Sequence, residues 1–303
     1  MEVEEQEVGT KLDLQALRQS ETDANQTCAV ILKVNYKNFG IQKKTYDLKI
    51  LGKTMTDYVA NAVFDANIKF AECEFGDDFL PLAKATTDPQ SKYTIVLFSD
   101  TPLFQHKTFL QIMEYFDVKK LLALKLTRGY VFQTSYLLSL DSLPQMQTQY
   151  FEEEDFVTCS SLKQFAIVTE MQKNRILDYF MKNGVVIVDP ASTFVDAQVD
   201  IAPNVVIEPF NTICGDTIIE GGVHLKSGNK IFDGIVCQNS CLQDTVIKDS
   251  FVGKNCDIRE CKIFGKSKIG DDVTTPEYCS FDGVCVSKEN KLESFVAYKA
   301  KEE

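Results

Sequence analysis

Residues 195–231 read Val195-Asp-Ala-Gln-Val-Asp-Ile201-Ala-Pro-Asn-Val-Val-Ile207-Glu-Pro-Phe-Asn-Thr-Ile213-Cys-Gly-Asp-Thr-Ile-Ile219-Glu-Gly-Gly-Val-His-Leu225-Lys-Ser-Gly-Asn-Lys-Ile231. An aliphatic residue stands at every sixth position of this stretch. Apolar residues would recur about every 3.6 positions in an α-helix and every second position in a flat strand. A period of six therefore indicates short strands separated by corners, with three strands in each triangular coil of about 18 residues. The stretch predicts a parallel β-helix in which coils stack about 4.8 Å apart and the aliphatic column points inward.

The aliphatic column continues beyond Ile231 with mixed steps of five and six residues. Its later members are Val236, Leu242, Ile247, Val252, Ile258, Ile263 and Ile269. We therefore place the β-helix at residues 185–273 and a C-terminal cap at 274–303. Burial of this column does not by itself offset the entropy lost on ordering its backbone. We expect additional contacts, either with the preceding domain or with other subunits.

The first half of the chain has a different pattern, in which strand-like and helix-like segments alternate. Strand patterns occur at 29–32, 93–99, 122–126 and 130–132, and helix patterns at 55–66 and 104–116. Such alternation predicts a parallel sheet covered by helices, with ligands bound beyond the carboxyl ends of the strands. We assign residues 28–159 to this α/β domain and residues 160–184 to a linker helix. Residues 1–27 form an acidic leader to which we assign no chemistry.

The charge of the 303-residue chain narrows the range of partners. Its net charge is −12, and a field of that sign repels nucleic-acid phosphates and anionic membrane surfaces. The first ten residues contain four glutamates where an export signal would have basic residues and an apolar run. The longest aliphatic runs are far shorter than the roughly 20 residues of a membrane helix. We therefore expect a cytoplasmic protein that binds neither nucleic acid nor membranes.

Ten cysteines are distributed too sparsely for a disulfide framework, so we expect free thiols. The pairs Cys237/Cys241 and Cys256/Cys261 could be read as zinc ligands. Their spacings are C-x3-C and C-x4-C within a strand pattern and without a neighbouring histidine. We favour small buried thiols over a zinc site.

Several short motifs resemble, in the same order, those of a known enzyme family. They are Cys28-Ala-Val-Ile-Leu32, Leu51-Gly-Lys-Thr-Met55, Thr94-Ile-Val-Leu-Phe-Ser-Asp-Thr-Pro-Leu103, and Gly184-Val185 with Asp189-Pro190. The family is the bacterial bifunctional N-acetylglucosamine-1-phosphate uridyltransferase/glucosamine-1-phosphate acetyltransferase family. The resemblance covers residues 28–273. It implies an α/β fold, with a reduced Rossmann-like nucleotidyltransferase domain, a linker helix and a short left-handed parallel β-helix.

The phosphate-binding loop of that family is not matched in this chain. In the family, a glycine-rich Ala-Ala-Gly-x-Gly-Thr-Arg-Met loop presents backbone amides to the nucleotide phosphates. Here the same place reads Lys33-Val34-Asn-Tyr-Lys37-Asn-Phe-Gly40. Val34 is β-branched and resists a positive φ, which leaves only Gly40 permissive. We expect the backbone cradle to be lost, so that the candidates for substrate binding are the ammonium groups of Lys33, Lys37 and Lys53.

The resemblance also implies a magnesium ligand at Asp100, at the end of the strand predicted at 93–99. A carboxylate oxygen suits Mg²⁺, although we favour a structural cap of the strand as the role of Asp100. The second ligand of the family is an asparagine before the linker helix, and Cys159 stands near that place here. A neutral thiol is a poor magnesium ligand. We therefore expect Mg²⁺ as a cofactor only if nucleotidyl transfer is retained.

Three functions remain open, and no residue is assigned as catalytic. We favour a degenerate relative of UDP-N-acetylglucosamine pyrophosphorylases that acts in assembly or regulation without turnover. The second is an active enzyme that makes a UDP-sugar from UTP and a sugar 1-phosphate. The third is a hexapeptide acyltransferase, although we expect the later coils to be lacking and both His106 and His224 to be structural. The resemblance implies a nucleotide or nucleotide-sugar ligand and a homotrimer, or a hetero-oligomer with an active paralogue.

Overall fold

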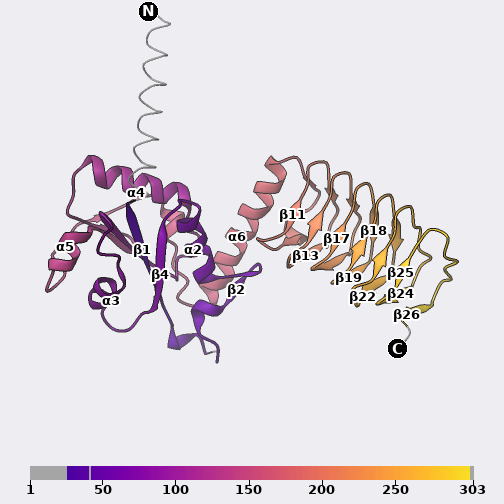
Figure 1. The fold of residues 1–303 in the computed structure, drawn as a ribbon, viewed down its shortest axis with the longest axis horizontal. Helices are drawn as coiled ribbons and strands as arrows, with labels where there is room; N and C mark the ends of the chain where they lie inside the picture. Colours follow the sequence, from indigo (N-terminus) through magenta and orange to yellow (C-terminus); the bar gives the residue numbers. More distant parts are fainter. Residues whose placement is uncertain (1–25, 41, 301–303) are drawn as a thin grey trace, which may run out of the picture. The chain divides into compact units, whose positions relative to one another are not determined.

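The computed structural model describes residues 26–40 and 42–300. The acidic leader expected at residues 1–27 lies, apart from its last two residues, outside the described part. The chain divides into two compact units. The first comprises Met1–Lys49 with Thr54–Val168, and the second comprises Ile50–Lys53 with Thr169–Glu303. The first unit is a mixed α/β structure and the second is repetitive (Figure 1).

A six-stranded mixed sheet forms the centre of the first unit, with the strand order β4-β1-β5-β7-β6-β8. The strands are β1 (Thr27–Lys33), β4 (Lys69–Glu74), β5 (Tyr93–Phe98), β6 (Ala123–Leu126), β7 (Gly129–Gln133) and β8 (Thr148–Gln149). A separate two-stranded sheet is formed by β2 (Lys49–Ile50) and β3 (Lys53–Thr54). The neighbouring strands β1 and β5 are apolar and buried nearly throughout. This pattern is expected for strands that are covered on both faces.

Helices cover both faces of the six-stranded sheet. The helices α2 (Met55–Phe64) and α4 (His106–Val118) pack with Ile31 and Ile95 in one core. The helices α3 (Phe79–Thr86) and α5 (Thr134–Ser139) pack with Val30 and Val96 in the other. Because successive strand residues point to opposite faces, β1 and β5 supply alternate residues to the two cores. The predicted Rossmann-like architecture is thereby confirmed.

The antiparallel strand β7 corrects the prediction of a parallel sheet. The strands β4, β1 and β5 are parallel, whereas β7 runs antiparallel to both β5 and β6. Only Thr127 and Arg128 separate β6 from β7. A parallel connection needs a crossover of a dozen or more residues, so this two-residue turn forces an antiparallel pair. The sheet is therefore mixed.

The helix α6 (Leu162–Lys182) corresponds to the predicted linker helix. Shortly after its end, Gly184 has a φ of 87°, in the left-handed region that glycine favours. Within the second unit, the buried Nζ of Lys173 donates to the carbonyl oxygen of Ala191 at 3.1 Å. In the described residues, no helix combines the length and apolarity needed to cross a bilayer. The short 3₁₀ helices are η1 (Lys37–Phe39), η2 (Thr45–Asp47), η3 (Glu153–Phe156) and η4 (Pro190–Ser192).

The second unit is a parallel β-solenoid whose strands form three sheets. The first sheet contains β10 (Phe194–Val195), β13 (Thr212–Cys214), β16 (Lys230–Phe232), β19 (Val246–Lys248), β22 (Lys262–Phe264), β24 (Ser280–Asp282) and β26 (Ala297–Lys299). The second contains β11 (Asp200–Ile201), β14 (Ile218–Ile219), β17 (Ile235–Val236), β20 (Phe251–Val252), β23 (Lys268–Ile269) and β25 (Cys285–Val286). The third contains β9 (Val186–Ile187), β12 (Val206–Ile207), β15 (His224–Leu225), β18 (Cys241–Gln243) and β21 (Asp257–Arg259).

The predicted aliphatic column forms the core of the solenoid. Every residue of the column from Val195 to Ile269 is buried, as the period of six predicts. The parallel ladders run on into residues 274–303, where the sequence pattern had suggested a cap, and Phe281 and Val286 extend the inner core there. The three-sheet arrangement is consistent with the left-handed β-helix expected from hexapeptide repeats.

Two buried asparagines stabilise one corner of the solenoid. Asn211 and Asn229 precede equivalent strands on successive coils, and both are fully buried. The side-chain Nδ2 of Asn229 donates to Asn211 Oδ1 at 3.0 Å and to the Lys226 carbonyl oxygen at 2.6 Å. Its Oδ1 accepts the backbone N–H of Thr245 at 3.0 Å. The amide therefore connects adjacent coils and satisfies buried backbone groups that water cannot reach.

We predict that Asn229→Ala lowers the free energy of unfolding by about 2 kcal/mol or more, because it leaves several buried polar groups without partners. Urea unfolding followed by circular dichroism measures the change. The matched control is Lys230→Ala at the next position, where the side chain is exposed and the expected change is within about 0.5 kcal/mol. Equal losses for the two variants would contradict the role of the asparagine ladder.

Candidate functional site

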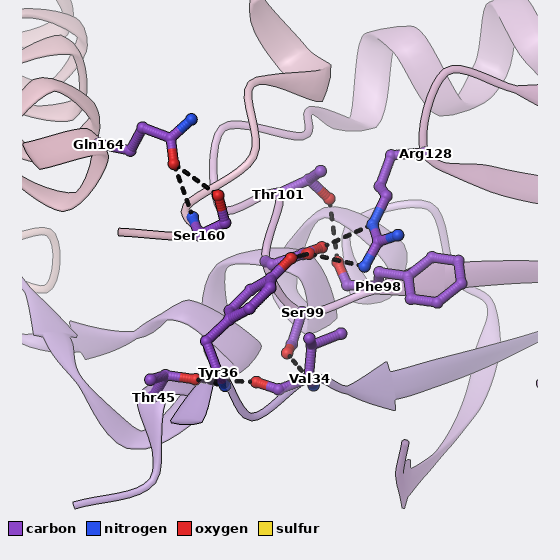
Figure 2. Close-up of polar contacts among 10 residues, drawn as sticks. Val34, Tyr36, Thr45, Phe98, Ser99, Thr101, Arg128, Ser160 and Gln164 are labelled. Atoms are coloured by element: carbon purple, nitrogen blue, oxygen red, sulfur yellow. Dashed lines mark hydrogen bonds and ion pairs between the residues drawn. The ribbon is translucent and has the colours of Figure 1, made fainter. Parts of the chain in front are cut away.

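Asp100 lies two residues beyond the carboxyl end of β5 and is completely buried. Its backbone carbonyl oxygen accepts the N–H of Cys159 at 2.7 Å. The following segment is held by Gln164, whose Oε1 accepts the N–H of Ser160 at 3.1 Å and its hydroxyl at 2.6 Å (Figure 2). These contacts bring the segment before α6 to the end of β5, as expected for a site at the carboxyl edge of the sheet.

A guanidinium group binds both carboxylate oxygens of Asp100. Arg128 Nε donates to Oδ1 at 3.1 Å, and Nη2 donates to Oδ2 at 2.7 Å. Arg128 comes from the two-residue turn between β6 and β7, and its guanidinium lies 4.0 Å from the centre of the Phe98 ring. A bidentate, charge-assisted pair of this kind has a defined geometry as well as a strong electrostatic attraction.

Tyr36 provides a third hydrogen bond to the same carboxylate. Its hydroxyl donates to Asp100 Oδ2 at 2.5 Å, and Figure 2 shows Tyr36 and Arg128 approaching from different segments of the chain. Burial, followed by the charge of Asp100, raises the pKa of Tyr36 above its ordinary value. The hydroxyl therefore keeps its proton and acts as a donor at neutral pH.

Backbone N–H groups of the loop after β1 donate hydrogen bonds to side chains of the same protein. The N–H of Val34 donates to Ser99 Oγ at 3.0 Å, and the N–H of Tyr36 donates to Thr45 Oγ1 at 3.0 Å. The chain then forms η1 and reaches Gly40, which has a φ of 68°. Gly40 is the residue for which the sequence predicts conformational freedom. The amides of Val34 and Tyr36 are thus committed to protein acceptors.

The three lysines that were proposed to bind substrate lie on three different elements. Lys33 Nζ lies 3.4 Å from Glu72 Oε2 and 5.6 Å from the centre of the Tyr46 ring. Lys37 is exposed on η1, and Lys53 lies in β3 within the second compact unit. Lys33 is therefore already paired with a carboxylate.

The residues around Asp100 do not fit magnesium. Both carboxylate oxygens accept hydrogen bonds from Arg128 or Tyr36. Cys159 is buried, and burial together with the charge of Asp100 raises the pKa of its thiol to about 12, so it is a neutral thiol at physiological pH. Within the described part of the chain, no three His, Cys, Asp or Glu side chains are grouped as metal ligands. Magnesium requires several oxygen ligands in octahedral geometry, which this arrangement lacks.

The histidines and the paired cysteines lie elsewhere. His224 Nε2 lies 2.8 Å from Glu208 Oε1 on the third sheet of the solenoid, and His106 is the first residue of α4. Cys237, Cys256 and Cys261 are buried, whereas Cys241 is partly exposed. A shallow hollow bordered by Phe64, Asn67, Ile68, Lys69 and Phe70 surrounds the start of β4, at the edge of the sheet opposite Asp100.

Sequence reasoning missed the roles of Tyr36 and Arg128. Arg128 precedes Gly129, which has a φ of 142° and leaves room for only a hydrogen beside the Val96 carbonyl oxygen. A cation followed by glycine between two short strand patterns indicates a tight hairpin, and that pattern was available in the sequence. The pairing of Arg128 with Asp100 required knowledge that β7 lies beside β5.

The described residues form a Rossmann-like α/β unit followed along the chain by a parallel β-solenoid of hexapeptide repeats. Among known proteins, the chain is similar to bacterial bifunctional GlmU proteins. It is 31% identical to that of Clostridium acetobutylicum over 127 residues, which is 40% of this chain and 28% of the relative. It is 31% identical to that of Clostridium novyi over 135 residues, or 42% and 30%. For Desulfitobacterium hafniense the values are 33% over 99 residues, or 33% and 22%.

These matches confirm the resemblance to the bifunctional family and show a GlmU-like protein. The matched part spans less than a third of the length of each of these relatives. No family model matches the chain. The similarity therefore concerns only part of these bifunctional relatives.

We predict that Arg128→Met lowers the free energy of unfolding by about 3 kcal/mol, because it leaves the buried carboxylate of Asp100 without its cation. The double variant Asp100→Asn/Arg128→Met regains part of this loss, since it removes the buried charge as well. Urea unfolding measures both changes. The control is Lys119→Met on the exposed surface of the same unit. A single variant as stable as this control would contradict the structural importance of the ion pair.

We also predict a loss of stability at alkaline pH. Burial raises the thiol pKa of both Cys159 and Cys214 to about 12, from an ordinary value of 9.0. Their contribution is fully present below pH 9 and is lost as the pH rises towards 12, because the unfolded thiols ionise first. The free energy of unfolding falls by up to about 1.4 kcal/mol per pH unit for each thiol.

Urea unfolding below and above pH 9 measures this dependence. Cys159→Ala provides the comparison, because it removes one of the thiols whose pKa is raised, and its stability should fall less steeply with pH. A wild-type stability that does not change above pH 9 would contradict the assignment.

Proposed function

We propose that this chain is a degenerate GlmU-like protein that keeps the nucleotidyltransferase-like unit for assembly or regulation and does not catalyse nucleotidyl transfer. The observation that carries this proposal is the bidentate contact of Arg128 with Asp100. The resemblance gives Asp100 the position of the magnesium ligand. In this protein the carboxylate is neutralised by a side chain of the same unit.

The ion pair opposes metal binding for two reasons. A magnesium ion at the Asp100 oxygens would have to displace hydrogen bonds from Arg128 and Tyr36, leaving a buried carboxylate with rearranged partners. It would also lie near a second cation, and a divalent and a monovalent charge about 4 Å apart repel by roughly 8 kcal/mol at an effective dielectric constant of 20. A magnesium site would have acidic or neutral oxygen ligands at the position that the Arg128 guanidinium takes here.

The loop between Lys33 and Gly40 supports the same proposal. Nucleotide phosphates are held by backbone N–H groups that point outward from a glycine-rich loop. The N–H groups of Val34 and Tyr36 instead donate to Ser99 and Thr45. Lys33, which could otherwise offset phosphate charge, lies beside Glu72. The groups that the resemblance assigns to phosphate and metal binding thus make internal contacts instead, which supports the proposed structural role of this unit.

We predict that the purified protein releases no pyrophosphate when incubated with UTP, N-acetylglucosamine 1-phosphate and Mg²⁺. The expected rate equals that of a reaction without protein, and added pyrophosphate verifies that the assay detects the product. Asp100→Asn is measured in parallel, together with its circular dichroism spectrum to establish folding. Pyrophosphate release by the wild type that the folded Asp100→Asn variant lacks would overturn the proposal.

A further inference from the structure

The corner of the solenoid that precedes the first sheet carries large side chains on three successive coils. Glu260, Tyr278 and Phe295 each stand two residues before a strand, namely β22, β24 and β26. These strands pair in parallel with one another, so the three residues occupy equivalent positions on adjacent coils. We call Glu260, Tyr278 and Phe295 the aromatic corner; its strands follow one another along the solenoid (Figure 1).

The backbone of the aromatic corner has a conformation that large residues rarely adopt. The φ angles are 51° at Glu260, 61° at Tyr278 and 63° at Phe295. At the corner before the third sheet, equivalent positions with positive φ are taken by Asn239 and Asn255, and asparagine tolerates this region far better. Bulky side chains strain such a turn. The geometry of the coil therefore does not account for the aromatic residues.

The two rings of the aromatic corner are accessible to solvent and stacked on each other. Tyr278 is 52% exposed and Phe295 is 77% exposed. Their ring centres lie 4.9 Å apart, and the ring planes are inclined by 18°. Rings with this exposure contribute little to the solenoid core. Their exposed faces carry the negative side of the ring quadrupole, which attracts cations.

Carboxylates surround the rings. Three of them act on the Tyr278 hydroxyl, namely those of Glu260, Glu277 and Asp244. The Oε2 atom of Glu260 is shielded from water and has no hydrogen-bond partner among the described residues. A shielded carboxylate oxygen of this kind is unfavourable unless a donor or a cation lies close to it. The electrostatic environment of the rings therefore favours a positively charged ligand.

The cations near the aromatic corner leave this acidic character in place. Arg259 donates from Nε and Nη2 to the two carboxylate oxygens of Asp257, at 3.0 and 2.6 Å. Lys262 is exposed at the start of β22. Lys291 and Glu293, which precede Phe295 in the sequence, are both exposed and of opposite charge. Together with the three carboxylates around Tyr278, the local balance of charge is negative.

The combination of a ring and a carboxylate favours a guanidinium group over an ammonium group. A guanidinium is flat, so it can stack on an aromatic ring while its N–H groups donate to a carboxylate, whereas an ammonium group is compact and more strongly hydrated. The first unit contains this combination, because Arg128 lies 4.0 Å from the centre of the Phe98 ring and binds both oxygens of Asp100. The aromatic corner offers the same two kinds of partner to an arginine of another molecule.

We propose that the aromatic corner is a binding site for arginine side chains of a basic peptide segment of another protein. A guanidinium stacks on the exposed rings of Tyr278 and Phe295, and the carboxylates of Glu260 and Glu277 offset its charge. The net charge of −12 attracts a basic segment from a distance. The site belongs to the solenoid alone and does not depend on whether the α/β unit has catalytic activity.

Isothermal titration of the full chain with a hexapeptide of alternating glycine and arginine tests the proposal. We expect a dissociation constant below about 1 mM at an ionic strength of about 0.05 M. Binding should weaken at about 0.5 M, where exposed charges are screened. The control peptide has citrulline in place of arginine, which keeps the shape of the side chain but removes its charge, and it should not bind. Equal binding of the two peptides would overturn the proposal.

Variants of the full chain locate the site. Phe295→Leu and Tyr278→Leu should each raise the dissociation constant roughly two- to fivefold, because each removes a cation–π contact. Glu260→Gln should raise it by about twofold or more. The matched controls are Phe210→Leu, at the same corner of an earlier coil with a φ of 64° and 69% exposure, and Glu114→Gln on the surface of α4. Neither control should change the dissociation constant.

Circular dichroism establishes that each variant is folded. Failure of the arginine peptide to bind wild type would overturn the proposal. Binding that is unchanged in all three variants of the aromatic corner would do the same, as would an equal loss in the control variants, since the peptide would then bind elsewhere on the acidic chain.

Discussion

The buried carboxylate of Asp100 must have a cation beside it, and the site in the first unit is arranged around that requirement. An ionised carboxylate without water or partners is too costly to bury. Arg128 provides the charge, and the stacking of its guanidinium on Phe98 holds the group in the orientation that a bidentate contact needs. Tyr36 completes the set of hydrogen bonds. A metal ion at this position could dissociate and bind again. The guanidinium of Arg128 is covalently attached to the chain and stays beside the carboxylate.

In the solenoid, the buried polar groups are those of the backbone, and the repeated ladders between coils provide their hydrogen-bond partners. Its strands contain only two or three residues, so no strand is stable alone, and each coil relies on the ladders to its neighbours. The corners are where ladder bonds end and where polar groups would be left without partners. Asn211 and Asn229 satisfy those groups from inside the prism. The core can therefore stay apolar along its full length.

Most of the fold could be predicted from the sequence, because it depends on periodicities that short stretches reveal. The column from Val195 to Ile269, the strand at β5 and the linker helix follow from apolar spacing alone. The antiparallel direction of β7 depends on a turn of only two residues, which strand patterns do not define. The partnership of Asp100 with Arg128 could not be predicted, because 28 residues separate them and their proximity depends on the order of strands in the sheet. Asp100 was singled out by the family resemblance at the end of a predicted strand, whereas its partner Arg128, which determines its electrostatic environment, was not predicted.

The two units differ in how far their groups are already paired within the protein. Groups without internal partners are the ones available for contact with other molecules. Around Asp100, the charges and the nearby amides are satisfied by groups of the same unit, so a ligand would have to displace existing bonds. On the outer face of the second solenoid sheet, the side chains of Ile218 and Ile235 are partly exposed to solvent. Binding of another molecule there would remove apolar surface from water without breaking internal hydrogen bonds. Apolar surface available for association therefore lies on the solenoid, whereas the polar groups around Asp100 already have partners, and this difference is consistent with the proposed role in assembly.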